Sequence, residues 1–184
     1  MTDAPLFARA LGEEFRRLPT CVRQVHASDP AVELRGIADV EGATGVFARL
    51  VARAFGFPRS ATGVEARVRI ERAGEGEIWT RAFGGARFRS LVKAGDQPGT
   101  LVERFGPFAF DIALTADESG FVMEVTGWRV FGLRAPKALA PVSTARGFAR
   151  ADGDYGFDVA IDMAVGGRLV RYSGWLTPIQ DRRG

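Results

Sequence analysis

The stretch VEARVRIE at residues 64–71 decides the fold class of this 184-residue chain. Its apolar and charged side chains alternate with a period of two, which is typical of a β-strand with one buried and one solvated face. Segments of this kind, separated by glycine-containing turns, continue to residue 177. We count roughly nine of them at the spacing of sequential hairpins, so the sequence predicts a mainly antiparallel β-sheet.

Two helices are predicted before this sheet. Asp3 can cap the first one, Pro5 suits its first turn and Pro19 ends it. Its apolar residues at helical spacing are Phe7, Leu11, Phe15 and Leu18. Between the helices a weaker pattern predicts a short strand around Gly36.

The second predicted helix lies between Thr44, which can cap it, and the stop signals Gly56 and Pro58. Its apolar residues on one face are Val46, Phe47, Leu50, Val51, Ala54 and Phe55. We therefore expect one α+β domain over residues 1–184, helical at about 3–58 and sheet-forming at about 63–177. Because an open sheet of many strands leaves two unprotected edges, we predict a strongly curved sheet or incomplete barrel. The helices would plug one side or end of it.

The composition is that of an ordinary globular protein, with 46% hydrophobic and 26% charged residues. The net charge of +3 comes from arginines that are interspersed with acids, unlike the concentrated basic patch of a nucleic-acid-binding protein. No apolar run approaches the roughly 20 residues that a membrane helix needs. We expect a cytoplasmic protein without a membrane span and without a nucleic-acid partner.

The familiar catalytic and cofactor motifs are missing from the sequence, which has no P-loop, dinucleotide fingerprint, CxxC, HExxH or GxSxG. With one histidine and one cysteine, a soft-metal site is not expected and no cofactor is predicted. His26 is a candidate general base or ligand contact; the alternative is a histidine that hydrogen-bonds within the loop after the first helix. Cys21 is expected to pack as a small apolar residue rather than to act as a nucleophile.

The segment WTRAF at residues 79–83 leaves two alternatives open. In a strand, Trp79, Arg81 and Phe83 share one face. If that face lines the core, Arg81 needs a carboxylate or an anionic ligand, because an unpaired buried charge is costly. If the other face is inside, Arg81 extends to solvent.

Glu103 shares a strand face with Leu101 and Phe105, so it could pair with Arg81 or act as a general acid or base. In addition, Trp128, Trp175 and Trp79 could line a cavity, although aromatic residues in sheets are usually core residues. The predicted ligand-binding residues are Trp79, Arg81, Phe83, Glu103, Trp128 and Tyr172.

Short motifs along the chain resemble a bacterial family defined only as a domain of unknown function. They are LPxxVRxxH at 18–26, GFP at 56–58, WxRxF at 79–83, ERFGP at 103–107 and YxGWL at 172–176. The resemblance implies an independently folding unit that occurs alone or joined to the C-terminus of NAD(P)-dependent reductase-like domains. It also implies that the positions His26, Trp79, Arg81, Glu103 and Tyr172 are shared. Where the family tends to have Pro-Leu-Pro, this chain has Arg-Ala-Pro at 134–136, and the family's acidic residue near Gly147 is absent.

Three hypotheses for function follow from these observations. The first is a module whose curved sheet encloses an apolar or amphipathic small molecule, with Arg81 or His26 meeting its polar group. The second is a cofactor-independent isomerase, cyclase or hydrolase that uses His26, Glu103 and Arg81 for acid–base chemistry. The third is a docking module for a reductase-type protein.

Overall fold

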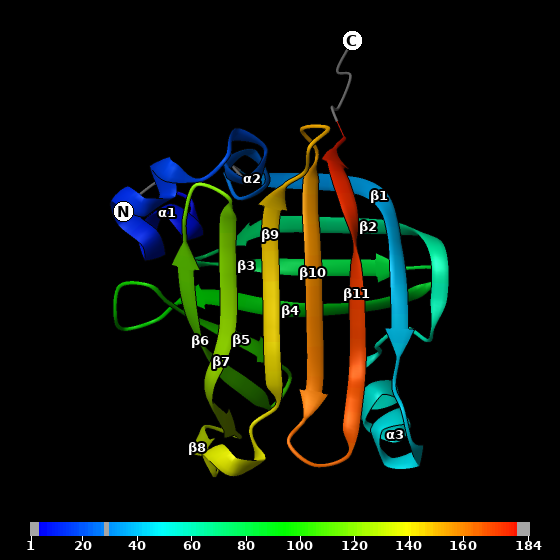
Figure 1. Ribbon diagram of the computed structural model, residues 1–184. Helices are drawn as coiled ribbons and strands as arrows, with labels where there is room; N and C mark the ends of the chain where they lie inside the picture. The colour runs from blue at the N-terminus through cyan, green and yellow to red at the C-terminus, as the bar shows by residue number, and fades with distance from the viewer. Residues whose placement is uncertain (1–3, 28–29, 180–184) are drawn as a thin grey trace.

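Ten antiparallel strands close into a barrel in this computed structural model, which describes residues 4–27 and 30–179. The strands in the described residues are β1 (Ala31–Gly42), β2 (Ala61–Ala73), β3 (Gly76–Phe83), β4 (Ala86–Ala94), β5 (Thr100–Phe105), β6 (Phe108–Ala116), β7 (Gly120–Val130), β8 (Leu133–Arg134), β9 (Val142–Ala149), β10 (Tyr155–Met163) and β11 (Gly167–Pro178). Each pairs with its sequence neighbour except where β7 pairs with β9 and β1 pairs with β11. The short strand β8 is attached to β7 outside the ring (Figure 1).

The prediction of a mainly antiparallel sheet is confirmed, whereas an incomplete barrel is wrong because the ring closes. Closure depends on β1, which pairs with β11 from Leu34 opposite Pro178 to Gly42 opposite Val170. The sequence predicts only a short strand here because the inward positions after Leu34 are small, with Gly36 and Ala38 weakening the apolar pattern. The strand nevertheless runs for 12 residues.

Gly36 allows β1 to pass close to its neighbour in the ring. A Cβ at this position would lie 1.8 Å from the carbonyl oxygen of Trp175 in β11. Figure 1 shows that β1 starts across the top of the barrel and then bends to run down its side, so this strand joins the two crossing halves of the wall. A glycine is required where two backbones approach this closely.

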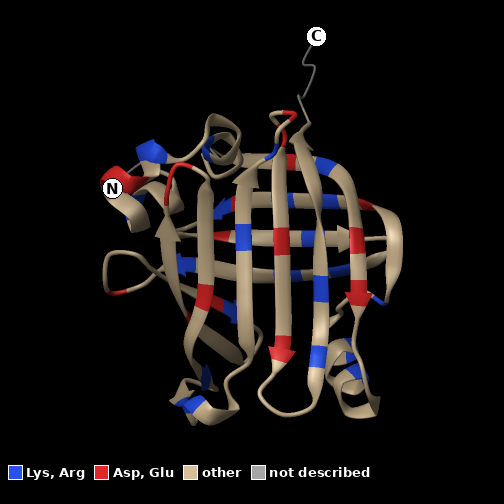
Figure 2. Ribbon diagram, in the orientation of Figure 1, with Lys and Arg blue, Asp and Glu red and all other residues tan. Residues whose placement is uncertain are grey.

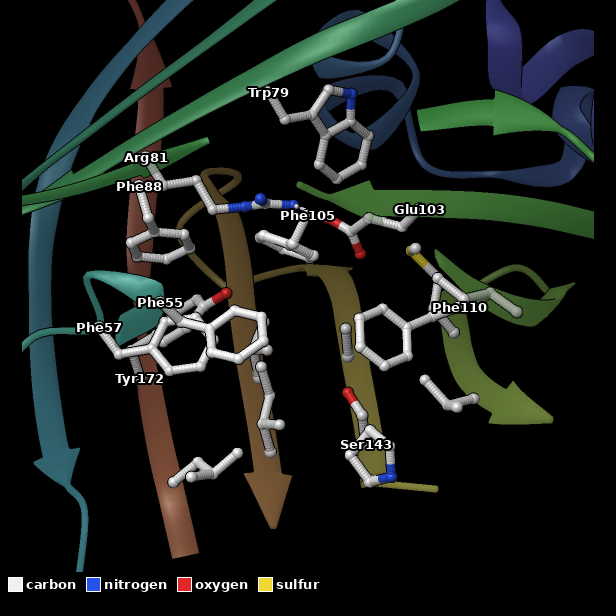
Figure 3. A pocket seen from close by; sticks show the side chains of 18 of the residues that line it. Phe55, Phe57, Trp79, Arg81, Phe88, Glu103, Phe105, Phe110, Ser143 and Tyr172 are labelled. Carbon is white, nitrogen blue, oxygen red and sulfur yellow. Dashed lines mark hydrogen bonds and ion pairs between the residues drawn. The ribbon is translucent and has the colours of Figure 1, made fainter. Parts of the chain in front are cut away.

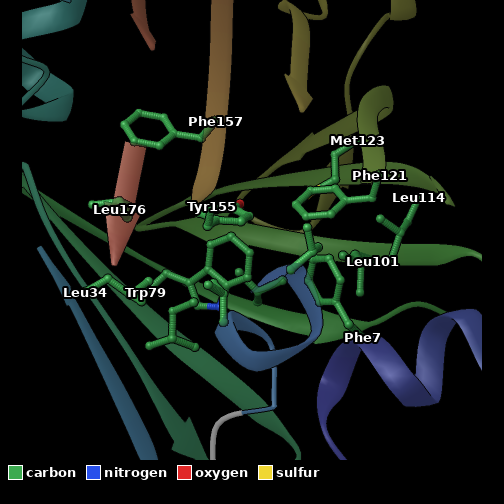
Figure 4. Close-up of a cluster of buried hydrophobic side chains, with 14 of the residues drawn as sticks. Phe7, Leu34, Trp79, Leu101, Leu114, Phe121, Met123, Tyr155, Phe157 and Leu176 are labelled. Atoms are coloured by element: carbon green, nitrogen blue, oxygen red, sulfur yellow. The ribbon is translucent and has the colours of Figure 1, made fainter. Parts of the chain in front are cut away.

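The helices before β1 cover one end of the barrel (Figure 1). They are α1 (Leu6–Leu11), the 3₁₀ helix η1 (Gly12–Arg17) and α2 (Thr20–Val25). The single helix predicted up to Pro19 is therefore wrong: the α-helix ends at Gly12, whose φ of 59° lies in the left-handed region. The predicted cap Asp3 lies outside the described residues. Phe7 of α1 and Val22 of α2 are buried in the core cluster that fills this end (Figure 4).

Polar contacts fasten α1 to the strand β3. The buried Glu77 carboxylate accepts a hydrogen bond from Trp79 Nε1 at 2.8 Å and another from the backbone N–H of Leu6. Burial raises the pKa of Glu77. Arg9 also donates to the carbonyl oxygen of Glu75 at 2.6 Å, so the helix is bound to the start of β3 from both sides.

The helix α3 (Val46–Phe55) lies at the opposite end of the barrel (Figure 1). The predicted cap at Thr44 is wrong, because Gly45 precedes the first turn and no side chain caps it. The helix buries Ala48 and Ala52 against Leu169, with Val51 partly buried beside them. Val46, Phe47 and Leu50 of the predicted apolar face are instead exposed. None of the helices in the described ranges is long and apolar enough to cross a membrane.

We predict that Gly36→Ala lowers the free energy of unfolding by about 3 kcal/mol, because the new methyl group overlaps the Trp175 backbone. Gly74→Ala is the control: its φ is 61° but no atom lies within 4 Å of its Cβ, so we expect a loss of about 1 kcal/mol. Urea denaturation measures both. Equal losses would show that the close contact between β1 and β11 is not limiting.

Candidate functional site

The inward face of the barrel encloses a cavity of about 800 Å³. Val25 and His26, at the end covered by α1 and α2, close it on one side. At the other end it is bordered by α3, by the turn between β10 and β11, and by residues 139–141 before β9. Several side chains on this border are exposed, so the cavity has its mouth there. The volume falls within the range of about 300–1,000 Å³ that is typical of small-molecule pockets.

The walls of the cavity are mainly aromatic and aliphatic. Six of the phenylalanines that line it are Phe55, Phe57, Phe88, Phe105, Phe110 and Phe157. Figure 3 shows Phe55, Phe57, Phe105 and Phe110 around the open space. Small residues keep this space open, since Ala145 of β9 and Ser143 face the cavity where larger side chains would fill it.

The strand β3 turns its larger face inward. Trp79, Arg81 and Phe83 are all buried and all line the cavity. Of the two alternatives for this strand, the one that sends Arg81 to solvent is therefore wrong. The Arg81 guanidinium lies 5.0 Å from the centroid of the Trp79 ring and 5.7 Å from that of Phe88, which places its charge against two aromatic groups.

Glu103 of β5 supplies the carboxylate that a buried Arg81 requires. Arg81 Nη2 donates to Glu103 Oε1 at 3.0 Å, and Arg81 Nη1 donates to Ser90 Oγ at 3.0 Å. The Ser90 hydroxyl in turn donates to Glu103 Oε1 at 2.6 Å. Burial acts to lower the pKa of Arg81, but the Glu103 charge acts against it and the net direction is upward. Arg81 and Glu103 thus form a buried ion pair whose total charge is zero, and Figure 3 shows it at the cavity wall.

Tyr172 of β11 places its hydroxyl toward the interior of the cavity, on the side of Arg81 (Figure 3). Its ring packs against Phe83 with 4.7 Å between centroids. Burial raises the pKa of Tyr172 to about 12, so the phenol remains protonated and can donate a hydrogen bond. Tyr155, nearer to His26, is also buried, and burial raises its pKa further.

His26 packs as an aromatic ring in the covered end of the barrel. Its ring stacks on Phe7 at 3.8 Å and meets Phe121 edge-on at 5.1 Å. Neither Nδ1 nor Nε2 has a hydrogen-bond partner among the described residues, so the expected bond within the loop is absent. Burial lowers the pKa of His26 to about 3, which makes it a neutral ring at neutral pH.

All seven site residues named from the sequence line one cavity: His26, Trp79, Arg81, Phe83, Glu103, Trp128 and Tyr172. Trp128 uses its indole N–H to hold the carbonyl oxygen of Pro136 at 2.9 Å, near the mouth. Trp175 does not line the cavity, and its ring lies 5.9 Å from the Arg150 guanidinium. Cys21 is partly buried, with its Sγ 3.8 Å from the carbonyl oxygen of Asp154.

Sequence reasoning missed Ser90, which joins the two members of the ion pair. The sequence pattern could have identified Ser90, because Phe88, Ser90 and Val92 alternate along β4 and all face inward. A small polar residue between two large apolar ones on one strand face indicates a buried polar partner. In the described part of the chain no three histidine, cysteine or acidic side chains are grouped to hold a metal.

Comparison with known families agrees with the motif resemblance. The model of a family described as Domain of unknown function (DUF4166) matches residues 18–176. No curated protein matches the chain.

We predict that His26 makes the protein less stable in mild acid. Its pKa is about 3 in the folded protein, whereas an exposed histidine of the unfolded chain has a pKa of 6.5, so the unfolded state binds the proton first as pH falls. The free energy of unfolding should fall by roughly 1.4 kcal/mol per pH unit below that value until the folded pKa is reached.

His26→Phe keeps the stack on Phe7 and removes the titrating group. Between about pH 7 and about pH 5, the wild type should lose roughly 2 kcal/mol more than this variant in urea denaturation. At about pH 7 the variant should be at least as stable, because it buries no unpaired nitrogen. If both proteins respond equally to pH, His26 is not the titrating group.

Proposed function

Because the chain belongs to the family Domain of unknown function (DUF4166), whose description gives no activity, we propose its function from the cavity: it binds an apolar or amphipathic small molecule. The observation that carries this proposal is an apolar cavity of about 800 Å³ with a buried ion pair in its wall. A barrel with only a structural role would fill its interior with side chains.

The polar part of the wall supports a ligand with one uncharged polar group. Arg81 and Tyr172 offer N–H and O–H donors, and Glu103 offers an acceptor. A carboxylate on the ligand would compete with Glu103 for Arg81 and would bring a second negative charge beside it. A hydroxyl or carbonyl group avoids that repulsion, so we infer an alcohol, ketone or ester as the preferred head.

The acid–base enzyme has less support from the geometry. It requires a base and an acid within hydrogen-bond reach of one substrate. The ring nitrogens of His26 are covered and form no bond to Glu103 or Arg81, and its lowered pKa makes it a weak base. Association with a reductase-type protein and a cytoplasmic location remain predictions.

Filling the cavity should abolish binding. Ala145→Phe places a ring in the open space, and Ser143→Phe does so from two residues away on the same face of β9. We expect each to weaken binding of the uncharged dye N-phenylnaphthylamine, followed by its fluorescence, by at least about tenfold. Native mass spectrometry of freshly purified wild type should also detect a bound small molecule.

The matched control is Ala160→Phe, which adds the same ring to β10 between the cavity-lining residues Val159 and Ile161 and therefore on the outer face. It should bind the dye as wild type does. Dye binding of wild-type strength in both folded β9 variants, shown by circular dichroism, would contradict a ligand site in the barrel.

Glu103→Gln should change which head group is preferred. The variant leaves Arg81 with an unpaired positive charge while keeping an acceptor oxygen near Ser90. Displacement of the dye should show palmitate binding about tenfold more tightly than to wild type, with hexadecanol nearly unchanged. The exposed Glu118→Gln makes the same change in net charge and should alter neither. An unchanged ratio of palmitate to hexadecanol affinity would place the ligand head away from the ion pair.

A further inference from the structure

The exposed large apolar side chains of the described residues gather at the mouth of the cavity. Eight belong to α3, to the β7–β8 turn with β8, to the β10–β11 turn and to the segment before and at the start of β9: Val46, Phe47, Leu50, Phe131, Leu133, Leu139, Val142 and Val165. Figure 1 shows all of these elements at one end of the barrel. Outside this end only Ile37 and Ile179 are exposed in the described ranges, and they are the two least exposed of the set. We call the eight residues the mouth rim.

The first half of the helix α3 presents its large side chains to solvent. Val46, Phe47 and Leu50 are 79%, 64% and 68% exposed, while Ala48 and Ala52 on the other side are buried. A helix that buries alanines and exposes a phenylalanine and a leucine is poorly explained by packing within the chain. Apolar surface of this kind marks an interaction site.

The turn between β7 and β8 holds another aromatic side chain in solvent. Phe131 is 82% exposed and has a φ of 49°, the only non-glycine residue of the described chain in the left-handed region. A bulky residue in this conformation is strained. Its backbone N–H is bound to the carbonyl oxygen of Pro107 at 2.9 Å, which fixes the turn. This strained conformation leaves the Phe131 side chain without a buried contact in the protein. We therefore attribute it to a contact with a partner outside the chain.

Basic residues accompany the mouth rim. Arg49 and Arg53 belong to α3, Arg134 to β8 and Lys137 to the 3₁₀ helix η2 (Lys137–Leu139). Within the described ranges no carboxylate forms an ion pair with any of these four. Figure 2 shows blue segments on α3 and around β8, with red at the ends of β1 and β10.

Two acids at this end of the barrel are held in ion pairs. Glu41 near the end of β1 and Asp162 near the end of β10 both pair with Arg168. The four basic residues beside the mouth rim, in contrast, keep their charges free of ion pairs within the described residues. Apolar side chains flanked by free cations are the features with which proteins bind the surface of an anionic bilayer.

We propose that the mouth rim docks the barrel on an anionic lipid membrane, so that the ligand moves between the bilayer and the cavity. In this peripheral contact the apolar side chains of the mouth rim enter the membrane–water interface, and the four basic residues contact lipid phosphates. The uptake step rests on the function proposed above, whereas the docking step stands on the rim alone.

A second copy of the chain fits this surface less well than a bilayer does. Two identical mouth rims placed face to face would bring the same four cations together, which is unfavourable. The apolar tips also come from separate segments around an opening, and a protein seated on them would seal the cavity. A fluid bilayer contacts all the tips and can exchange an amphipathic molecule through the opening.

Flotation of the protein with vesicles tests the docking step. We expect binding to vesicles made of equal parts of phosphatidylcholine and phosphatidylglycerol, and weaker binding to phosphatidylcholine alone or at high salt. Leu50→Glu combined with Phe131→Glu should reduce the partition coefficient at least about tenfold, since neither residue lines the cavity but both belong to the rim. Arg49→Ala with Arg53→Ala should lower binding to the anionic vesicles only.

The control is Ile179→Glu, which puts one negative charge, against two in the rim variant, on an exposed apolar residue beyond the end of β11 away from the mouth. It should bind vesicles as wild type does. The docking proposal is overturned if wild type does not float with anionic vesicles, if Ile179→Glu reduces flotation as much as the rim variant, or if light scattering shows a dimer that the rim variant dissociates.

Binding of N-phenylnaphthylamine in solution separates the two proposals. Dye binding without vesicle binding overturns docking and leaves the proposed function standing. Vesicle binding without dye binding overturns the proposed function and leaves the docking proposal standing. If both hold, the rim variant should keep wild-type affinity for the dye in solution but take it up from anionic vesicles at least about tenfold more slowly.

Discussion

Closure of the sheet through the pairing of β1 with β11 is the constraint on which the rest of the molecule depends. A closed ring has no free edge, so every strand of the ring has a partner on each side and no edge needs to be covered by a helix or loop. One face of each strand in the ring then points into the interior, whichever side chains that face carries. The cost of closure is the close approach at Gly36, where only a glycine fits.

The position of β3 in this ring explains why the ion pair of Arg81 with Glu103 is buried. Its inward face carries Trp79 and Phe83, which stabilise a core, and Arg81 comes with them because it lies between them. The cost of burying the charge is offset by Glu103 and by two hydrogen bonds through Ser90. Removing one partner of such a pair is strongly destabilising, because the other charge is left buried and alone. The same pair gives an otherwise apolar cavity a position for a polar group.

Much of the fold could be predicted from local pattern, because alternation in segments such as residues 64–71 is itself the physical cause of a two-faced strand. The same rule placed Trp79, Arg81 and Phe83 on one strand face and Glu103 with Leu101 and Phe105 on another, without deciding which face lies inside. Closure could not be predicted, because it depends on the small residues Gly36 and Ala38, which carry little hydrophobic signal. The face of β3 was undecided for a related reason: the partner that stabilises Arg81 inside lies on another strand, and only the register of β4 and β5 brings it near.

The covered end of the barrel has a consequence for the order of folding. Phe7 and His26 precede all of the strands in the sequence, yet their rings contact Trp79 of β3, Phe121 of β7 and, for His26, Tyr155 of β10. These three strands become neighbours around one space only when the wall between them has assembled. Contacts between residues so distant along the chain form slowly, since the entropy of a long loop must be lost first. The helices that precede the strands along the chain are therefore among the last parts of this domain to reach their native positions.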